Sequence, residues 1–371
     1  MKVKILSTKD YAEWIEILTK VEHDIYFIPE YARIYELNYG SKIDEAFFGK
    51  SFLFCYKENN NFVILPFTLR EINTLLFLSE SLSADKEQRY YDLISPYGYN
   101  GPAIKCDNHS EVNQLVNNFL SEFNQYCLDN NIVTSFIRFH PLLNNQQYFL
   151  TQLNTTERNK TVYVDLTKTQ DQLFNELNKK TRNLIRKAKK NGVSISISTD
   201  EQDLKQFTKL YLETMHRNKA QEKYFFPYGY YKNTFKFLSS HAVLFIAKHQ
   251  GKIISASVFL GYNQFFHYHF SGSDFNSLSL APNNLLIWEA ILWSKKNGYK
   301  WLHLGGGLRE NDSLFHFKSG FSSCFNKFYT ANIIHNLYNY EMLNSLKAEF
   351  EAKRGKKSTF SDFFPKYREI L

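Results

Sequence analysis

Two histidines separated by a single residue are the first side chains in this sequence whose type and spacing indicate chemistry. His267 and His269 lie in a predicted strand, where side chains alternate, so both should face the same side. Imidazole titrates near neutral pH, and either ring can take a proton from an attacking ammonium group. We select His269 as the candidate base, with a packed or hydrogen-bonded structural histidine as the alternative. A third ligand does not stand at a recognisable spacing, so a metal site is not predicted.

A run of seven basic residues lies between Lys179 and Lys190, in a stretch that the pattern predicts to be helical. Such a run usually forms a solvated helix face. Because the apolar residues of the same helix should point inward, we expect Arg182 and Arg186 to face solvent or a cleft. Phosphate groups are natural partners for such a cluster, and a tRNA backbone and a diphosphate both provide them.

The segment over 91–102 combines aromatic rings, glycine and proline with one carboxylate. A rigid loop with exposed rings suits stacking on a nucleotide base or a sugar, and Tyr97 and Tyr99 are the candidate rings. Asp92 can hydrogen-bond a sugar amine, which makes it a candidate catalytic residue. A turn-rich connector whose rings merely pack is the alternative.

Two further groups could bind phosphate or approach a ligand closely. Arg138 and His140 end a short predicted strand, and a guanidinium group matches phosphate oxygens in geometry, with a surface ion pair as the alternative. Gly305-Gly306-Gly307 follow a buried strand, where glycine permits close backbone approach and supplies amide donors. A loop without a ligand is the alternative there.

The elements that must position these residues form two successive stretches of helix followed by strands. Thr169 and Gln172 have capping-box spacing at the start of a long predicted helix in the second stretch. Three adjacent strands separated by short turns favour antiparallel pairing over the alternation of a doubly wound fold. Helices are predicted over 11–18, 112–128, 169–191, 202–218 and 282–296, and strands over 52–56, 62–69, 132–139, 161–166, 193–197, 242–247, 252–260, 264–270, 300–304 and 327–334.

Composition narrows the class of protein. A chain of 371 residues exceeds what one core usually serves, so we expect two domains, 1–158 and 159–371. A net charge of +8 is compatible with nucleic acid, an anionic membrane surface or a polyphosphate ligand. The four cysteines are widely spaced, as expected of buried apolar residues in a reducing compartment. The sequence shows neither a signal peptide nor a membrane-spanning run, and we expect a cytoplasmic enzyme.

Seven short motifs, taken in order, resemble the GNAT fold as the Fem-like N-acyltransferases use it. They are YDLISPYGYNGP at 91–102, RFHP at 138–141, KKTRNLIRKA at 179–188, YLETMHRN at 211–218, HYHFSGS at 267–273, HLGGG at 303–307 and FKSGF at 317–321. The resemblance implies a mixed α+β (α/β) fold of two tandem GNAT-type domains, each a mostly antiparallel mixed sheet flanked by helices. The second domain would bind the acyl carrier.

The resemblance also implies site residues. The carrier's pantetheine arm would pair with the edge of the strand over 264–270, and its pyrophosphate would meet the start of the helix near Pro282. Lys318 would lie near the transferred group, where a cation stabilises developing negative charge. The glycine-rich pyrophosphate loop of simpler GNAT enzymes is replaced by SDFNSLSL at 273–280. The implied carrier-binding residues are Phe270, Ser271, Gly272, Asn283 and Asn284, and the implied substrate-binding residues are Tyr97, Tyr99, Arg138, His140, Arg182, Arg217, Gly305 and Gly306.

The activity implied is direct N-acyl transfer, because the sequence has no GxSxG or Cys–His nucleophile signature. Acyl-CoA would serve as co-substrate, without a tightly bound cofactor. The acceptor would be an amino-deoxy sugar linked to dTDP or UDP and destined for a cell-surface polysaccharide. The alternative is aminoacyl-tRNA-dependent transfer to a peptidoglycan precursor, although the coiled-coil insertion often found in such enzymes is not visible. A binding module with a catalytically silent GNAT fold is the third hypothesis.

Overall fold

The computed structural model describes residues 2–40, 46–81, 88–307, 309, 312–355 and 362–369. The chain divides into two compact units. Unit 1 comprises Met1–Leu37, Phe47–Glu157 and Tyr329–Leu371, and unit 2 comprises Asn38–Ala46 and Arg158–Phe328. The first long crossing falls beside the boundary expected at 158/159, but residues 329–371 belong to unit 1 and not to the second domain.

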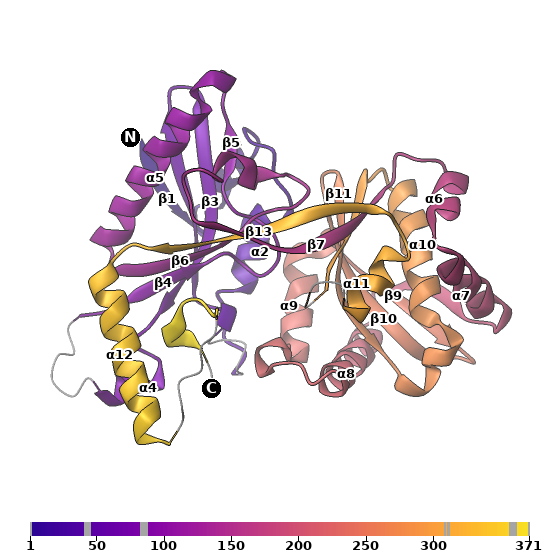
Figure 1. Cartoon of the computed structure of the whole chain (residues 1–371). Coiled ribbons are helices and arrows are strands. Elements are labelled where there is room, and N and C mark those ends of the chain that lie inside the picture. The colour runs from indigo at the N-terminus through magenta and orange to yellow at the C-terminus, as the bar shows by residue number, and fades with distance from the viewer. Residues whose placement is uncertain are drawn as a thin grey trace. The chain divides into compact units, whose positions relative to one another are not determined.

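Unit 1 contains a mixed sheet, with α5 packed against strands β2, β3 and β6 (Figure 1). The apolar stripe predicted for this helix is buried, with Val116 and Phe119 fully excluded from solvent. A second cluster joins α4 and α12 through residues such as Phe77 and Leu343. The elements are β1 (Val3–Ser7), α1 (Tyr11–Leu18), η1 (Ile25–Phe27), α2 (Pro29–Ile34), β2 (Lys50–Glu58), β3 (Asn61–Glu71), α4 (Leu76–Ser81), β4 (Tyr91–Ile94), β5 (Ala103–Lys105), η2 (His109–Glu111), α5 (Val112–Asp129), β6 (Ile132–Arg138), η3 (Asn145–Tyr148), α12 (Leu337–Lys353) and η7 (Lys366–Arg368).

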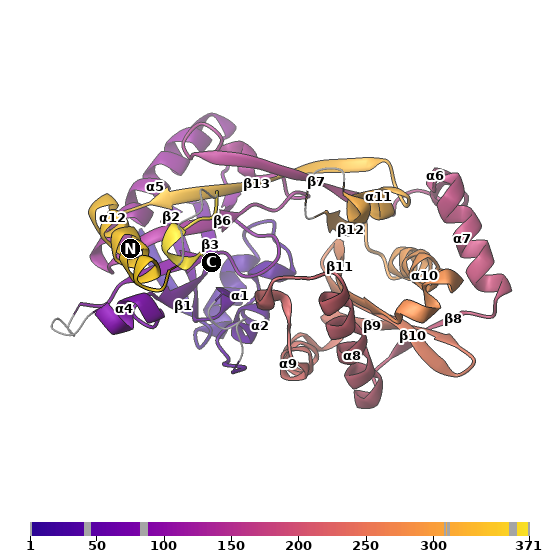
Figure 2. The same ribbon diagram turned by 60° about the horizontal axis from the view of Figure 1, so that its bottom comes forward.

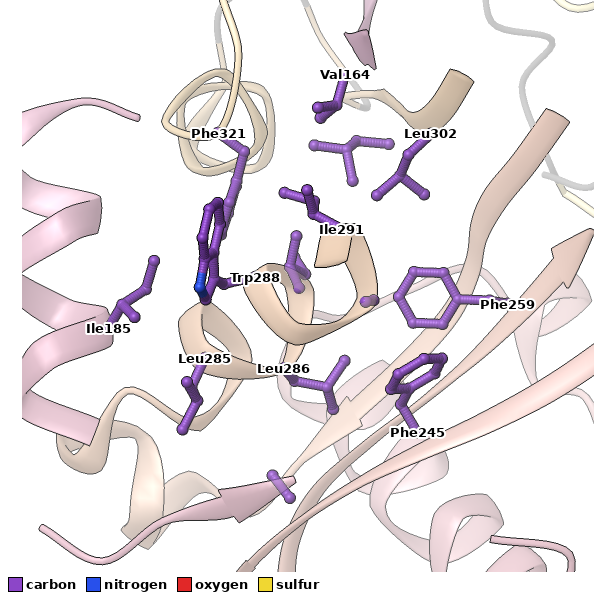
Figure 3. Close-up of a cluster of buried hydrophobic side chains, with 14 of the residues drawn as sticks. Val164, Ile185, Phe245, Phe259, Leu285, Leu286, Trp288, Ile291, Leu302 and Phe321 are labelled. Atoms are coloured by element: carbon purple, nitrogen blue, oxygen red, sulfur yellow. The ribbon is translucent and has the colours of Figure 1, made fainter. Parts of the chain in front are cut away.

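Unit 2 has its own mixed sheet and a core built around α10 (Figure 3). Trp288, Leu286 and Ile291 of this helix are buried among strand residues such as Phe245, Phe259 and Leu302. The elements are α6 (Gln170–Glu176), α7 (Lys179–Lys190), β8 (Ser194–Ser198), α8 (Glu201–Arg217), η4 (Glu222–Tyr224), α9 (Tyr228–Leu238), η5 (Ser239–His241), β9 (Ala242–His249), β10 (Lys252–Tyr262), β11 (Phe265–Ser273), η6 (Phe275–Leu280), α10 (Pro282–Lys296), β12 (Trp301–Gly306) and α11 (Ser313–Ser319).

The two units share one strand order. It runs β1-β2-β3-β4-β6-β13 in unit 1 and β8-β9-β10-β11-β12-β7 in unit 2. In both, the first three neighbouring pairs are antiparallel, the fourth is parallel and the fifth is antiparallel. One helix connects the parallel strands, α5 in unit 1 and α10 in unit 2. The expectation of two mostly antiparallel mixed sheets flanked by helices is therefore confirmed.

The sixth strand of each sheet comes from the other half of the chain. β7 (Thr155–Asp165) follows β6 in sequence, yet Thr161 pairs with Gly306 of β12 in unit 2. β13 (Cys324–Ile334) follows unit 2 in sequence, yet Thr330 pairs with Arg138 of β6 in unit 1. This exchange explains why the C-terminal segment belongs to unit 1.

The long helix predicted over 169–191 is broken into α6 and α7. The predicted capping box forms, because the Thr169 hydroxyl accepts from the Gln172 amide and the Gln172 side chain accepts from the Thr169 amide. Leu177 has an extended ψ of 139°, which ends α6. Asn178 then caps α7, since its Oδ1 accepts from the Thr181 amide at 2.7 Å. Of the helices within the described ranges, none combines the length and apolarity needed to cross a membrane.

Candidate active site

In unit 2 the parallel strands β11 and β12 separate after three residue pairs. Phe265, Phe266 and His267 pair with Trp301, Leu302 and His303. Beyond these positions β11 continues to pair with β10 as far as Ser273, and β12 continues to pair with β7 as far as Gly306. The described register thus leaves the last residues of β11 without a ladder partner in β12. A strand edge of this kind can add an extended ligand through main-chain hydrogen bonds.

A β-bulge lies where the strands separate. Val258 of β10 pairs with Phe270 and the next residue, Phe259, pairs with Tyr268, so His269 is the extra residue. The bulge sends its neighbours to opposite faces: the Tyr268 ring packs on Phe259, and the Phe270 ring packs on Tyr211 of α8. The expectation that His267 and His269 share a face rested on regular alternation, which the bulge removes.

Hydroxyl groups join β10 and β11 to the start of α10. The Ser257 hydroxyl donates to Ser271 Oγ at 2.9 Å. The hydroxyls of Ser255 and Ser273 both donate to Oδ1 of Asn283, which is the second residue of α10. Asn283 therefore ties the helix start to the two strands. The helix is preceded by Ala281 in a left-handed conformation, whose side chain offers no cap to the first amides.

Tyr268 adds a buried phenol to this group of hydroxyls. Burial raises the pKa of Tyr268, and hydrogen bonds with Ser271 and Ser257 oppose that rise. Neither Tyr268 nor the serines of β10 were singled out in the sequence. The signal was present, because Ser255 and Ser257 alternate with alanine and valine in a strand whose other residues are apolar.

Lys318 of α11 extends to the end of β12. Its side chain is only 8% exposed, its Nζ donates to the Gly306 carbonyl at 2.7 Å, and it lies 6.0 Å from the centre of the Tyr268 ring. Burial lowers the pKa of Lys318 to about 8, although Asp312 favours the charged form. Lys318 therefore carries a cation that can also lose its proton near neutral pH.

The glycines that follow β12 have steric reasons for being glycine. Gly305 has a φ of +75°, in the left-handed region. A Cβ on Gly306 would come within 2.8 Å of the Lys160 carbonyl oxygen of β7. Gly305 and Gly306 thus shape the strand end that receives Lys318, and the ligand contact expected of them stays a prediction.

His269 is poorly suited to the base role expected from the sequence. Burial, and secondarily His267, lowers the pKa of His269 to about 3. An imidazole with so low a pKa holds an incoming proton weakly at neutral pH. The sequence argument assumed a solvated ring, and the depressed pKa corrects it.

Arg217 lies at the end of α8, near the loop after β11. Its Nη1 donates to the Ser273 carbonyl at 3.3 Å, and its guanidinium lies 5.7 Å from the centre of the Phe275 ring. Phe275 is 65% exposed and belongs to the segment that replaces a glycine-rich loop. Asn284 of α10 is only 7% exposed, so it offers a ligand less access than a residue on the helix surface would.

Comparison with known proteins identifies the domain that carries this geometry. The acetyltransferase (GNAT) domain family matches residues 175–319. Unit 2 contains a GNAT acetyltransferase domain. The chain is accordingly an acyltransferase by domain content, and the expected GNAT recognition is confirmed.

Solved structures extend the fold resemblance along the chain. FemX matches with a TM-score of 0.63 and 13% identity, over 92% of this chain and 99% of FemX. A Bacteroides thetaiotaomicron protein of unknown function matches with a TM-score of 0.53 and 12% identity, over 89% of this chain and 99% of that one. The C-terminal domain (DUF2156) of a protein named as a lysylphosphatidylglycerol synthetase from Agrobacterium fabrum matches with a TM-score of 0.51 and 12% identity, over 92% and 96% of the two chains. Comparison of the sequence with curated proteins finds no significant match.

In unit 1 the structure brings Tyr97 and Arg138 together. The Arg138 guanidinium lies 5.6 Å from the centre of the Tyr97 ring, with Phe47 and Phe136 at 5.8 and 5.6 Å. Tyr99 packs instead near Tyr26, with ring centres 6.0 Å apart. The predicted loop over 91–102 therefore presents a ring and a guanidinium side by side.

His140 is engaged within unit 1. It is fully buried, and its Nδ1 accepts from the backbone amides of Leu142 and Leu143 at 3.2 and 3.0 Å. Its proton must then reside on Nε2, which donates to Asp24 Oδ2 at 2.8 Å. Burial and these bonds give His140 a structural role, which corrects the expectation of a phosphate ligand.

Asp92 is also engaged within unit 1. Its side chain is fully buried, Oδ1 accepts from Arg70 Nε at 2.8 Å, and Oδ2 accepts from Arg368 Nε. Burial opposes its ionisation, but the two guanidinium groups prevail and lower the pKa of Asp92. A carboxylate enclosed in this way corrects the expectation of a catalytic contact with a sugar amine.

Three residues of unit 2 have packing or capping roles that the sequence did not reveal. Arg182 Nη1 donates to the Asn175 and Leu177 carbonyls at 2.8 and 2.6 Å, so it caps the end of α6. Gly272 permits α8 to approach β11, because a Cβ there would lie 2.3 Å from the Tyr211 amide nitrogen. The Phe270 side chain is only 4% exposed, so only its backbone is suited to a carrier.

Proposed function

We propose that this acyltransferase transfers an acyl group from acyl-CoA to the amine of an amino-deoxy sugar linked to dTDP or UDP. The observation that carries the proposal is the separation of β11 from β12, with buried Lys318 hydrogen-bonded to Gly306 at the end of β12. A strand edge suits the amides of a pantetheine arm, and the uncapped first turn of α10 suits a pyrophosphate.

The reaction would proceed by direct attack. The neutral amine of the sugar attacks the thioester carbonyl, an N–C bond forms and the C–S bond breaks, and the sulfur leaves as a thiolate. Lys318, with a pKa lowered to about 8, takes the proton that the amine loses and returns it to the thiolate. Backbone amides at the end of β11 hold the oxyanion, and positioning supplies much of the rate.

The acceptor would use the ring and guanidinium presented by unit 1. A nucleotide base stacks on a ring such as Tyr97, and the fork of Arg138 matches phosphate oxygens. Arg138 and Tyr97 thus replace Asp92 and His140 as the acceptor-side candidates. Formation of an N-acylated nucleotide sugar would serve cell-surface polysaccharide synthesis.

The alternative is transfer from an aminoacyl-tRNA to a peptidoglycan precursor. Two observations favour it: the resemblance in fold to FemX, and the exposed cations of α7. Six of the seven basic residues of α7 are classed as exposed, namely Lys179, Lys180, Arg186, Lys187, Lys189 and Lys190.

The proposal is tested by incubating the full chain with acyl-CoA and a dTDP- or UDP-linked amino-deoxy sugar and measuring the amide product by mass. We expect product only when both substrates are present. Lys318→Ala should lower kcat by about 100-fold, in the range of general acid–base contributions. His316→Ala, an exposed change on the same helix, should have little effect. Turnover only with aminoacyl-tRNA would establish the alternative, and nucleotide binding without turnover on any donor would indicate a silent module.

A further inference from the structure

A hollow of about 480 Å³ lies where α6, α7 and α10 meet, three helices that neighbour one another in both views (Figures 1 and 2). It is a feature of unit 2 that the sequence did not indicate, because the predicted continuous helix would not have folded α6 back beside α7. Its lining residues are Gln170, Asp171, Phe174, Asn175, Lys189 and Trp288.

The hollow combines flat apolar surface with hydrogen-bonding groups. Phe174 and Trp288 meet edge to face, with ring centres 5.2 Å apart. Around them, the amides of Gln170 and Asn175 and the carboxylate of Asp171 offer donors and acceptors to the edge of a planar ligand. Rings with polar groups around them are the features that a heteroaromatic base requires.

A row of cations borders the same hollow. Arg182, Arg186 and Lys189 stand at positions i, i+4 and i+7 of α7, so they lie along one side of the helix. The Arg186 guanidinium lies 5.4 Å from the centre of the Phe174 ring, and Lys189 Nζ is held by Glu289 at 2.9 Å. Arg182 is engaged in capping α6, which leaves Arg186 and Lys189 as the cations nearest the rings. Exposed cations beside a base-sized hollow are suited to phosphate groups.

We propose that this hollow binds the adenine nucleotide end of the acyl carrier. The Asp171 carboxylate can accept from the exocyclic amine of adenine, whereas uracil and thymine carry no such amine; this favours the carrier over the nucleotide of the sugar. Trp288 is five residues along α10 from Asn283, about 7.5 Å at the rise of an α-helix. A carrier with its pyrophosphate at the start of α10 therefore has its adenosine within reach of the hollow, and α7 packs against both η6 and α10.

This inference rests on the proposed function for the identity of the carrier, but a binding experiment tests the hollow without turnover. The probe is adenosine 3′,5′-bisphosphate, titrated onto the full chain by calorimetry, with uridine monophosphate as the comparison nucleotide. The test variant is Arg186→Gln/Lys189→Gln. The control is Lys180→Gln/Lys187→Gln, which removes two exposed cations from the same helix that do not line the hollow.

We expect the bisphosphate to bind more tightly than uridine monophosphate. The test variant should weaken bisphosphate binding about tenfold or more, since contacts to a charged phosphate are lost, and the control should bind as the unmodified chain does. Equal weakening in both variants would reduce the effect to net charge and overturn the proposal. Failure of the bisphosphate to bind, with tight binding of a CCA-ended RNA, would overturn it in favour of an RNA partner.

A second experiment separates the hollow from the proposed function by comparing acyl-CoA with S-acyl-pantetheine, which lacks the nucleotide. The test variant should lower kcat/KM for acyl-CoA about tenfold and leave that for S-acyl-pantetheine unchanged. An equal loss for both donors would overturn the proposal. If neither donor is turned over while the bisphosphate binds and the test variant weakens it, the proposed function fails and the nucleotide site stands.

Discussion

Replacing Asp92 by asparagine should destabilise unit 1 without a specific effect on chemistry. The carboxylate is 0% exposed and holds two guanidinium groups that are themselves 6% and 7% exposed. The asparagine side chain would preserve the volume but remove the charge between Arg70 and Arg368. The change would therefore leave two buried cations facing one another without their counter-ion.

Removing one member of a buried ion pair typically costs about 3–5 kcal/mol, because the remaining charge is uncompensated. At roughly 2–4 °C per kcal/mol for domains of about 150–250 residues, the melting temperature should fall on the order of 6–20 °C. Circular dichroism with thermal and urea unfolding measures the change. Asp107→Asn is the matched control, since it removes an exposed carboxylate that pairs with Lys105 at 3.3 Å and should cost about 1 kcal/mol or less.

The reasoning is refuted by one pattern of results. If Asp92→Asn unfolds at the same urea concentration as the unmodified chain while kcat falls strongly, Asp92 contacts the reacting groups and the ion-pair account is wrong. Double-mutant cycles with Arg70→Met and Arg368→Met would locate the coupling, which should be of the same sign for both partners.

Two further predictions concern pH. Burial lowers the pKa of His335 to about 4, so between pH 4 and its unfolded value near 6.5 the unfolded state binds more protons; stability should fall by about 3 kcal/mol as pH drops through this window, and His335→Asn should flatten that dependence in urea unfolding. Burial lowers the pKa of Lys318 to about 8, so kcat for N-acyl transfer should rise with pH and level off above that value; Lys318→Arg should abolish the rise, and an unchanged profile would remove Lys318 from proton transfer.

The sequence supported those parts of the fold that depend on local pattern. The helix predicted over 282–296 is α10 with the same bounds, and the capping box at Thr169 forms as expected. It could not support features that depend on distant partners. The bulge at His269 is defined by its pairing with β10, and the burial that lowers the pKa of His269 comes from the folded unit. Asp92 was chosen as a lone carboxylate because Arg368, its partner, stands far away in the sequence.

The exchanged strands have a consequence for how the chain is made. Every strand of the unit 2 sheet lies between Thr155 and Gly306, so that sheet can close while synthesis is still under way. β6 must wait longer, because Thr330 pairs with Arg138, and roughly 190 residues of synthesis take about 10–40 s at 5–20 residues per second. Until then one edge of β6 lacks its neighbour on the ribosome, where an open edge invites wrong pairings. The unit that begins first is completed last.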